Sequence, residues 1–527
     1  MSKGTEEDSK SSISESESLE PTTIRVAILG TGLAGLATAY KLSKASTEAI
    51  RYEVHLFDER TSIGFDASSV KAVDKSGNPV RVDVPMRSFA GGYYRRAISF
   101  YKSLGLEFYD AKFSYSFSEL DTTSRSAKTY FLHGGRKGTF SEGGKPVEMT
   151  WLAYLFSLIA VAFTFVYFTL VANYARPRGG LSFENEYCSK SAEHKRWCED
   201  IEKHAGGEGP YGALDTGNEG PAPSVAVETL EQYARRWNLS KTFMRRFVVP
   251  LFCAVSTCDA SVVLAAPASD IIDYKRTTFR QPHYLLRNNS ISAVSALLAA
   301  LDSQKDQVHL GQSVSAMLCE PTGQWTIRTA GGTDYSNFNH VVMAMAPRRI
   351  CQLYTPLEKI LASVQACMVR VLVHTDDRVL DYMRAEDVRD LNLLTDPLSG
   401  RTEATHVLKP GVYQTTSPLS LGNLYPGVSK GLEKGNNDAK IDHKVHTETQ
   451  NAQSTPIRID TSKILSESTF ERVVRTPSLV DAVEELRTRQ GRGNVWVAAS
   501  WMWQGLVLLE GCLTSAESVS DGILARA

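Results

Sequence analysis

The sequence predicts an α/β protein whose N-terminal part is a Rossmann-like dinucleotide-binding unit. An apolar strand at 24–29 leads into the glycine-rich segment GTGLAG at 30–35, and an Ala- and Leu-rich helix follows. A second apolar strand at 51–58 ends in the acids Asp58 and Glu59. Strand, glycine-rich turn, helix and acid-terminated strand, in this order, are typical of a dinucleotide site. The alternative is a glycine-rich turn in another α/β fold.

Each glycine of this segment has a physical role in a dinucleotide site. Gly30 allows the tight turn, Gly32 lets the backbone approach a pyrophosphate, and Gly35 lets the helix pack closely on the strand. The helix begins at Leu33 and Ala34, whose N–H groups are unpaired and lie at the positive end of the helix dipole. These five residues are therefore predicted to bind the phosphates of the dinucleotide.

The acid at the end of the second strand is expected to accept the ribose hydroxyls. Either Asp58 or Glu59 has the required chemistry. Asp58 follows the apolar strand directly and is the favoured residue.

Composition narrows the class of protein. The 527 residues suffice for two or three domains, and 58 basic residues nearly balance 59 acidic ones, which argues against nucleic-acid binding. Eight cysteines in so long a chain do not form a disulfide framework. Cys253 and Cys258 lie in an apolar run without nearby histidines, so we expect buried thiols there and no metal site.

Three polar segments are expected to lie outside the folded core. Residues 1–22 are rich in Ser and Glu, which predicts disorder, and they lack the apolar stretch of a cleaved signal peptide. The polar composition of segment 176–222, with its Gly and Pro clusters, predicts a surface loop. The still more polar composition of segment 421–457 predicts a disordered insertion. The protein is expected to be intracellular.

The apolar run 151–172 carries no charge over its length. A helix of that length, at about 1.5 Å per residue, can cross a hydrocarbon core of about 30 Å. We therefore expect a membrane-associated protein in which the run spans, dips into or rests on the bilayer. The alternative is a buried helix or a wall of an apolar substrate tunnel.

The chain resembles the flavin-containing amine oxidase superfamily at five places. The chain is most similar to the branch of predicted NAD/FAD-binding oxidoreductases related to amine oxidases and phytoene desaturases. The segments are GTGLAGL (30–36), SIGFDASSV (62–70) with RVDVPMRSF (81–89), VHLGQSVSAM (308–317), FNHVVMAMAP (338–347), and VWVAASW (495–501) with LLEG (508–511).

The resemblance implies FAD as a non-covalent cofactor. Met86 and Arg87 would lie beside the flavin, and Val314 would pair its backbone with the adenine. The element that closes over the flavin would contribute Ser500, Leu508, Leu509 and Glu510, the last as an anchor of the turn. Unpaired N–H groups at the start of the last helix would face the flavin N1–C2=O edge.

The resemblance also implies the domain organisation. A Rossmann-like FAD-binding domain is expected from three separate segments, with an interleaved α+β substrate domain. The FAD-binding segments are 23–120, 305–350 and 493–527, and the substrate and membrane-associated region comprises 121–304 and 351–492. A single membrane crossing at 151–172 would separate segments that must share one domain, so both flanks are expected on the same side.

The predicted function is an FAD-dependent oxidoreductase that dehydrogenates or desaturates a lipophilic small molecule. Three departures from the superfamily bear on this: Ala366 stands where monoamine oxidases have a flavin-bridging lysine, Leu508 where they have an aromatic cage residue, and Ala499 where a glycine is usual. The alternatives are an amine or amino-acid oxidase that produces peroxide, and a non-enzymatic membrane-tethered flavoprotein. The sequence identifies neither catalytic residues nor the electron acceptor, oxygen or a carrier.

Overall fold

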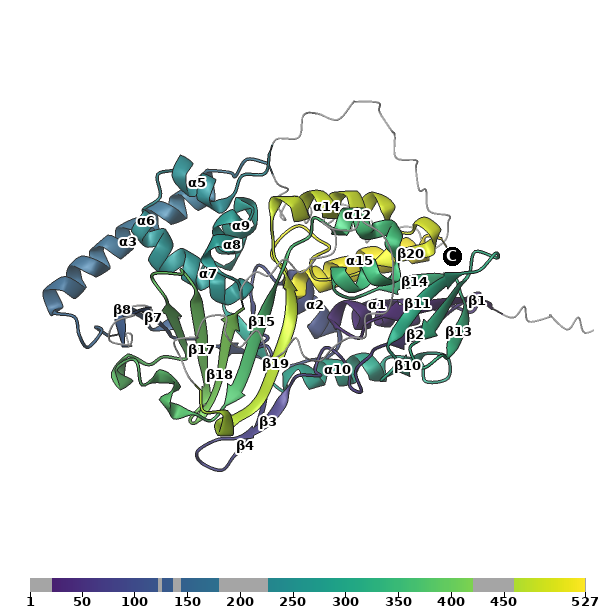
Figure 1. Ribbon diagram of the computed structural model, residues 1–527, viewed down its shortest axis with the longest axis horizontal. Coiled ribbons are helices and arrows are strands. Elements are labelled where there is room, and N and C mark those ends of the chain that lie inside the picture. The colour runs from purple at the N-terminus through teal and green to yellow at the C-terminus, as the bar shows by residue number, and fades with distance from the viewer. Residues whose placement is uncertain (1–20, 122–125, 136–143, 180–225, 420–458, 527) are drawn as a thin grey trace, which may run out of the picture.

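The computed structural model describes residues 21–121, 126–135, 144–179, 226–419 and 459–526, and Figure 1 shows them as two lobes. One lobe holds the glycine-rich segment and both ends of the described chain. The other holds a large antiparallel sheet with helices along one side. The predicted disorder at 1–22, apart from its last two residues, and the predicted loop at 421–457 lie outside the described residues. So does all but the start of the predicted loop at 176–222.

A five-stranded sheet forms the centre of the first lobe, in the order β10-β2-β1-β14-β20, with every neighbouring pair parallel. The apolar strands predicted from the sequence are β1 and β2, and both are buried at their carboxyl ends. Burial of both faces is typical of a parallel sheet covered by other elements on each side. The strands are β1 (Thr22–Leu29), β2 (Ile50–Phe57), β10 (Gln307–His309), β14 (His340–Met343) and β20 (Val495–Val497).

The two faces of this sheet bury different side chains because successive residues of a strand alternate in direction. Ile28 and Val342 belong to the core under α1 (Leu33–Lys44), α10 (Asn289–Ala299) and α15 (Leu509–Leu524). Leu29 and Met343 belong to a second core. Its cover is the antiparallel meander β11 (Val314–Cys319), β12 (Trp325–Thr329) and β13 (Asp334–Phe338), with α11 (Pro347–Leu353), α12 (Glu358–Leu361) and α14 (Pro477–Arg489).

The second lobe is built on a seven-stranded sheet in the order β19-β15-β18-β17-β16-β7-β8. All neighbouring pairs are antiparallel except β16 and β7. The strands are β7 (Tyr115–Leu120), β8 (Ala127–His133), β15 (Ala366–His374), β16 (Leu391–Thr395), β17 (Thr402–Lys409), β18 (Val412–Pro418) and β19 (Ile464–Val473).

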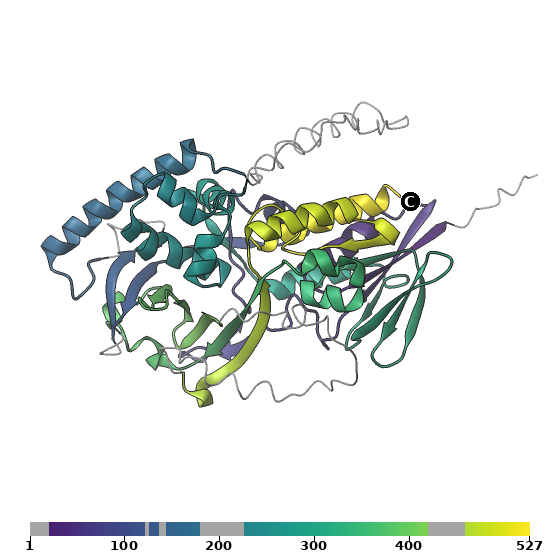
Figure 2. The same cartoon turned by 45° about the horizontal axis from the view of Figure 1, so that its top comes forward.

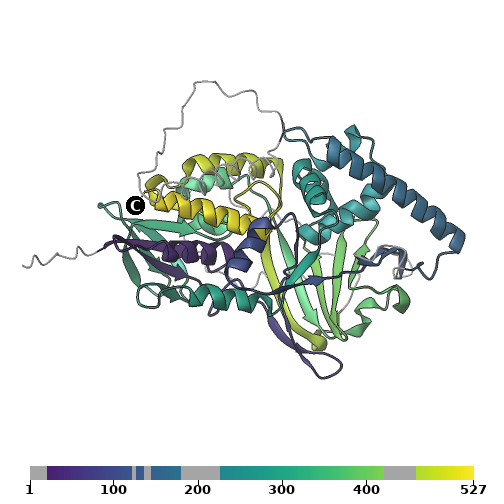
Figure 3. The same cartoon turned by 180° about the vertical axis from the view of Figure 1, so that it is seen from behind.

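Helices that lie together between the apolar helix and this sheet cover one of its sides (Figure 3). They are α5 (Leu230–Arg236), α6 (Lys241–Phe243), the π-helical turn η3 (Met244–Val248), α7 (Val249–Ser256), α8 (Ala260–Ala265) and α9 (Ala268–Thr278).

Smaller elements join the lobes: β3 (Val70–Val73) pairs with β4 (Pro79–Val82), and β9 (His283–Leu286) lies between β5 (Phe89–Ala90) and β6 (Phe108–Ala111), near α2 (Arg95–Ser103). The short 3-10 turns are η4 (Thr355–Leu357), η5 (Asp377–Leu380), η6 (Ala385–Asp387), η8 (Thr461–Lys463) and η9 (Arg492–Asn494).

The domain boundaries differ from those expected from the sequence. The first segment of the cofactor lobe ends before 120, because β7 pairs with β16 and β8 in the second sheet. In addition, α11, α12 and α14 lie within the predicted substrate region 351–492 or at its edge, yet they pack on the cofactor sheet. A helix that covers a parallel sheet has the same apolar pattern as one that covers an antiparallel sheet, so the sequence did not separate the two.

The apolar run forms α3 (Trp151–Tyr174), which lies along the outside of the second lobe (Figure 2). One stripe of the helix, including Phe168 and Val171, packs on the lobe, while Trp151 and Phe163 are 72% and 75% exposed. The predicted alternative of a buried core helix is therefore wrong. Within the described residues α3 is the one helix long and apolar enough to cross a membrane.

The two outer glycines of the glycine-rich segment are fixed by contacts that leave no room for a side chain. A Cβ at Gly35 would lie 2.0 Å from the Gly30 carbonyl oxygen, and a Cβ at Gly30 would lie 2.3 Å from the Ala344 oxygen. We expect Gly35→Ala to lower the free energy of unfolding by roughly 1–3 kcal/mol or to prevent folding, because helix and turn must separate.

Gly32→Ala is the matched control, because a Cβ at Gly32 meets nothing within 4 Å. It should unfold close to the wild-type temperature in thermal denaturation. Equal stability of the Gly35→Ala protein would contradict the close approach described here.

Candidate cofactor site

Open space lies above one glycine of the segment. Gly32 is the N-cap of α1 and provides no side-chain cap, so the N–H groups of Leu33 and Ala34 begin the helix at this space. Since a Cβ at Gly32 would point into it, this is the cradle that the sequence predicts for a pyrophosphate. Gly30 and Gly35 instead shape the turn, as their close contacts show.

Asp58 and Glu59 differ clearly in position. The Asp58 carboxylate accepts hydrogen bonds from Thr31 N at 2.9 Å, from Thr31 Oγ1 at 2.5 Å and from Arg60 N at 3.0 Å. Thr31 Oγ1 in turn accepts from Gly64 N at 2.7 Å. Asp58 thus ties the glycine-rich turn to the chain after β2, whereas Glu59 is exposed. Of the two acids, Asp58 is the one that contacts the glycine-rich turn, and it remains the acid predicted for the ribose.

The closing element is held at the loop that precedes α15. Leu506 N donates to the Tyr93 hydroxyl at 2.9 Å, and Trp503 Nε1 donates to the Leu506 carbonyl at 2.9 Å. The loop ends at Leu508, the N-cap of α15, which provides no side-chain cap for the N–H groups at Leu509. Because α1 and α15 lie side by side (Figure 3), two uncapped helix N-termini belong to one region of the molecule.

Glu510 anchors the start of α2, whereas the resemblance implied that it anchors the turn of the closing element. It is fully buried, and its two carboxylate oxygens accept from Arg96 N at 2.9 Å and Ala97 N at 3.1 Å, in the first turn of α2. Burial raises the pKa of Glu510 to about 7, against the effect of these two N–H groups.

Cys512 lies where α1 and α15 begin, and Arg87 acts on it electrostatically. The Arg87 guanidinium stacks 4.1 Å over the Phe65 ring and donates from Nη2 to the Phe65 carbonyl at 2.5 Å, while its buried Nε has no partner in the described part of the chain. The Cys512 thiol is hydrogen-bonded by the Ala34 backbone and the Ser500 side chain, and burial raises its pKa to about 11. Arg87 also adds positive potential at this thiol. The region therefore suits an anionic group.

Met86 and Val314 occupy the edges of this region. Met86 N donates to the Gln414 side chain at 3.0 Å, which links the segment before Arg87 to β18. Val314 begins β11, and its carbonyl accepts from Arg349 Nη2 at 2.7 Å. The predicted adenine contact at Val314 would share that carbonyl with Arg349.

An aromatic stack at the end of β2 was not predicted from the sequence. Phe57 and His309 stack with centroids 4.6 Å apart, and Tyr335 lies 4.6 Å from His309. Asp58 N donates to the His309 carbonyl at 3.0 Å, which places the stack beside the ribose-binding candidate. Burial lowers the pKa of His309 to about 4, so the ring is neutral. These residues come from three distant strands, and only the fold brings them together.

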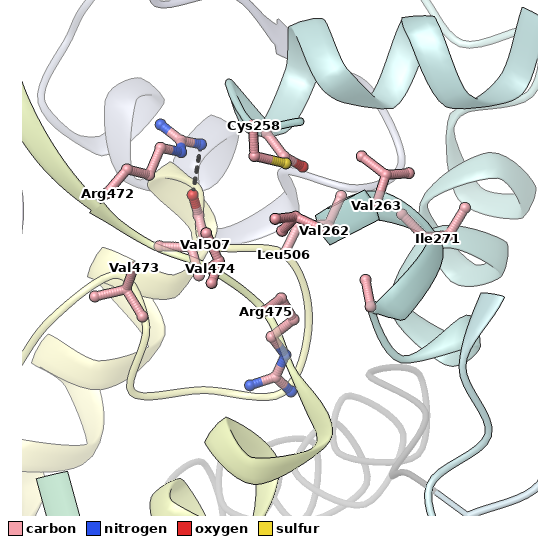
Figure 4. Close-up of a pocket in the computed structure, with 12 residues that line it drawn as sticks. Cys258, Val262, Val263, Ile271, Arg472, Val473, Val474, Arg475, Leu506 and Val507 are labelled. Carbon is pink, nitrogen blue, oxygen red and sulfur yellow. Dashed lines mark hydrogen bonds between the residues drawn. The ribbon is translucent and has the colours of Figure 1, made fainter. Parts of the chain in front are cut away.

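A small cavity lies between the two lobes (Figure 4). Its volume is about 20 Å³, enough for about one water molecule. Arg475 in its wall forms a buried ion pair with Asp270 at 2.6 Å, and Arg472 lies on the side of the closing element. The apolar lining includes Val262, Val263, Ile271, Val473, Leu506 and Val507.

Two cysteines and one histidine are buried within the protein core. Cys253 and Cys258 are buried, and burial raises the pKa of both thiols, as expected for structural cysteines. His374 is fully buried, hydrogen-bonds Thr415 Oγ1 at 3.1 Å, and has a pKa lowered to about 4 by burial. No cluster of metal-ligating side chains occurs within the described ranges.

Comparison with known proteins agrees with this architecture. Residues 28–104 match the model of an NAD(P)-binding Rossmann-like domain. A putrescine oxidase variant with redesigned cofactor binding superposes with a TM-score of 0.50 at 12% identity, covering 96% of this chain and 100% of that one. An oxidoreductase from Methanosarcina mazei gives a TM-score of 0.48 at 13% identity, covering 94% and 100%. No curated protein matches the sequence.

The chain thus has an amine-oxidase-like fold that contains an NAD(P)-binding Rossmann-like domain. This confirms the predicted fold class, and it confirms at the level of the fold the resemblance to the flavin-containing amine oxidase superfamily.

The Glu510 contacts predict a stability effect. Glu510→Ala removes the acceptors of two buried N–H groups and should lower the free energy of unfolding by roughly 1–3 kcal/mol for each group left unpaired. Glu517→Ala, on the exposed side of the same helix, is the control and should change stability by about 1 kcal/mol or less, since its partners are partly exposed. Denaturant titration measures both.

The raised pKa of Glu510 adds a pH dependence with a defined sign. A carboxyl group whose pKa is higher in the folded state stabilises it at pH below the unfolded value, and this stabilisation is lost as pH rises toward about 7. The wild type should therefore lose stability relative to Glu510→Gln between about pH 4.5 and 7. A parallel pH dependence of the two proteins would contradict the buried, protonated state.

Proposed function

We propose that the protein is an FAD-dependent oxidoreductase that dehydrogenates or desaturates a lipophilic small molecule. The observation that carries the proposal is the open cradle at Gly32, bordered by the uncapped start of α1 and close to the start of α15. When bound, FAD would supply the redox chemistry. The chain supplies N–H groups for the phosphates, Asp58 for the ribose and Arg87 as a nearby cation.

The apolar walls between the lobes support a lipophilic substrate. Neither a lysine nor an aromatic ring is present at positions 366 and 508. Ala366 is 3% exposed, and Leu508 is partly buried. This argues against amine oxidation of the monoamine oxidase kind, although putrescine oxidase shares the fold. An amine or amino-acid oxidase and a non-enzymatic flavoprotein remain the alternatives that experiment must separate.

Purified protein should be yellow and should release FAD on denaturation. Gly32→Val should remain folded, because its side chain points into open space, yet lose the flavin because that space is the proposed pyrophosphate site. Gly331→Val is a matched control at an uncrowded glycine in the β12–β13 turn and should keep its flavin. Absorption spectra of folded samples decide; full FAD occupancy in Gly32→Val would refute the assignment.

We further propose that α3 rests in the plane of a membrane surface. The Tyr233 hydroxyl donates to the carbonyls of Val171 at 3.2 Å and Ala175 at 2.8 Å, which fixes the end of the helix to the second lobe. Tyr154, near its start, is buried against the same lobe. A helix held along its length with one apolar side exposed fits an interfacial position better than a span.

If α3 lies in the plane of the membrane, two charges placed on its exposed side should release the protein from the membrane. Phe156 and Phe163 are 64% and 75% exposed, and burial of each in lipid should contribute roughly 1.5–3 kcal/mol. The double change to Glu should abolish flotation with liposomes. The same change at Val73 and Leu398, which are 59% and 81% exposed but lie elsewhere, should not.

Protease protection tests the topology with tags at residues 1 and 527. Both tags should be cut from the same side of the membrane. Opposite accessibility would mean that α3 spans the bilayer, and would contradict the in-plane position.

A further inference from the structure

Arg472 lies where the two lobes meet. It stands at the end of β19, directly across from Cys367 of β15. Its Nη2 atom donates to the Val507 carbonyl of the closing element at 2.9 Å (Figure 4), and more weakly to the Val255 carbonyl of α7 at 3.5 Å. The guanidinium therefore bridges the candidate cofactor lobe and the wall of the second lobe.

No carboxylate of the described residues lies within 4.0 Å of this guanidinium, although other arginines packed into the fold have such partners. Examples are Arg475 with Asp270, Arg236 with Glu228 and Arg276 with Asp273. The titratable groups that act most on Arg472 are thiols and a phenol. Burial raises the pKa values of all four, which keeps them neutral: Tyr94, Cys258, Cys367 and Cys512.

The charge of Arg472 is thus uncompensated. An arginine stays protonated even when burial lowers its pKa, as it does here. Enclosing a charge without an anion costs several kcal/mol, which the two carbonyl contacts offset only in part. A ligand that brings an anion removes that cost.

Two of the three guanidinium nitrogens of Arg472 have no acceptor within the described residues. Both carbonyl contacts come from Nη2, and within the described residues Nε and Nη1 donate to no acceptor. Arg472 as a residue is partly exposed. Nη1 can donate a charge-assisted hydrogen bond to an oxygen of a carboxylate.

We infer that Arg472 binds the carboxylate of a lipophilic acid that is the substrate of this site. The side chains that line the cavity beside it are mostly apolar, Val507 among them, and Arg475 adds no net charge because Asp270 neutralises it. The cavity there holds about one water molecule, so only a small head group enters it. Arg87, which stacks over the Phe65 ring, is the cation assigned to the cofactor in the proposed function.

The inference rests on the proposed function and specifies its substrate class. The full-length protein is titrated by calorimetry with decanoate, decanol and decylamine, after its visible absorption has been recorded. The wild type should bind decanoate about tenfold or more tightly than either of the other two. Without flavin absorption the proposed function fails, while the decanoate titration of the same sample still decides the role of the arginine.

Substitutions separate a binding role from a structural one. Arg472→Gln should weaken decanoate binding about tenfold or more, and Arg472→Lys should retain part of it. Arg370→Gln is the matched control on the same sheet, since Arg370 is partly exposed and pairs with Glu467 at 2.8 Å. It should bind decanoate like the wild type.

Arg472→Met tests the uncompensated charge itself. Without decanoate it should melt at or above the wild-type temperature, because an unpaired enclosed charge is removed. A clearly lower melting temperature would show that the guanidinium serves the fold, and would overturn the inference. Unchanged decanoate affinity in Arg472→Gln, or preference of the wild type for decanol or decylamine, would overturn it as well.

Discussion

The close approach of α1 to the turn after β1 is the contact on which the rest of the site depends. It exists because Gly35 lets the helix lie against the Gly30 carbonyl, where a Cβ would come within 2.0 Å. That approach directs the first N–H groups of α1 into the open space at Gly32. The last helix, α15, then packs along α1, so that chain segments separated by almost the whole sequence share one site.

The polar groups around this site are of two kinds: side chains that hydrogen-bond within the protein and hold the fold, and arginines that keep unused donors. Asp58, Glu510 and Tyr93 have their hydrogen bonds inside the protein, and they hold the turn after β1, the start of α2 and the closing loop. Arg87 and Arg472 keep nitrogen atoms without protein partners in the described residues. The structural side chains already have hydrogen-bond partners, while the two arginines still have unused donors. Such a site suits anionic ligands, and a dinucleotide and a carboxylate are both anions.

Much of the cofactor lobe was predictable because its signals are local. The glycine-rich segment, the helix after it and the acid at the end of β2 lie within one stretch of sequence, and each occupies its predicted place. Glu510 was predicted to be an anchor, but its partners lie 413 and 414 residues away, so which helix it anchors could not be foreseen.

Arg472 and the boundary at β7 required the fold for a similar reason. A missing ion-pair partner is a property of the tertiary structure, and the choice of sheet for a short strand depends on pairing with β16, far along the chain. The exposure of α3 was also open, because apolar length alone does not distinguish a core helix from a membrane-facing one.

Anaerobic titration of the flavin absorption tests the central claim most directly. A panel of lipophilic acids, other lipids, terpenoids, amines and amino acids is added to the purified protein without oxygen. The account predicts that lipophilic acids bleach the flavin and that putrescine does not. Bleaching by amines alone, or no bleaching by any compound in a protein that holds FAD, would contradict it.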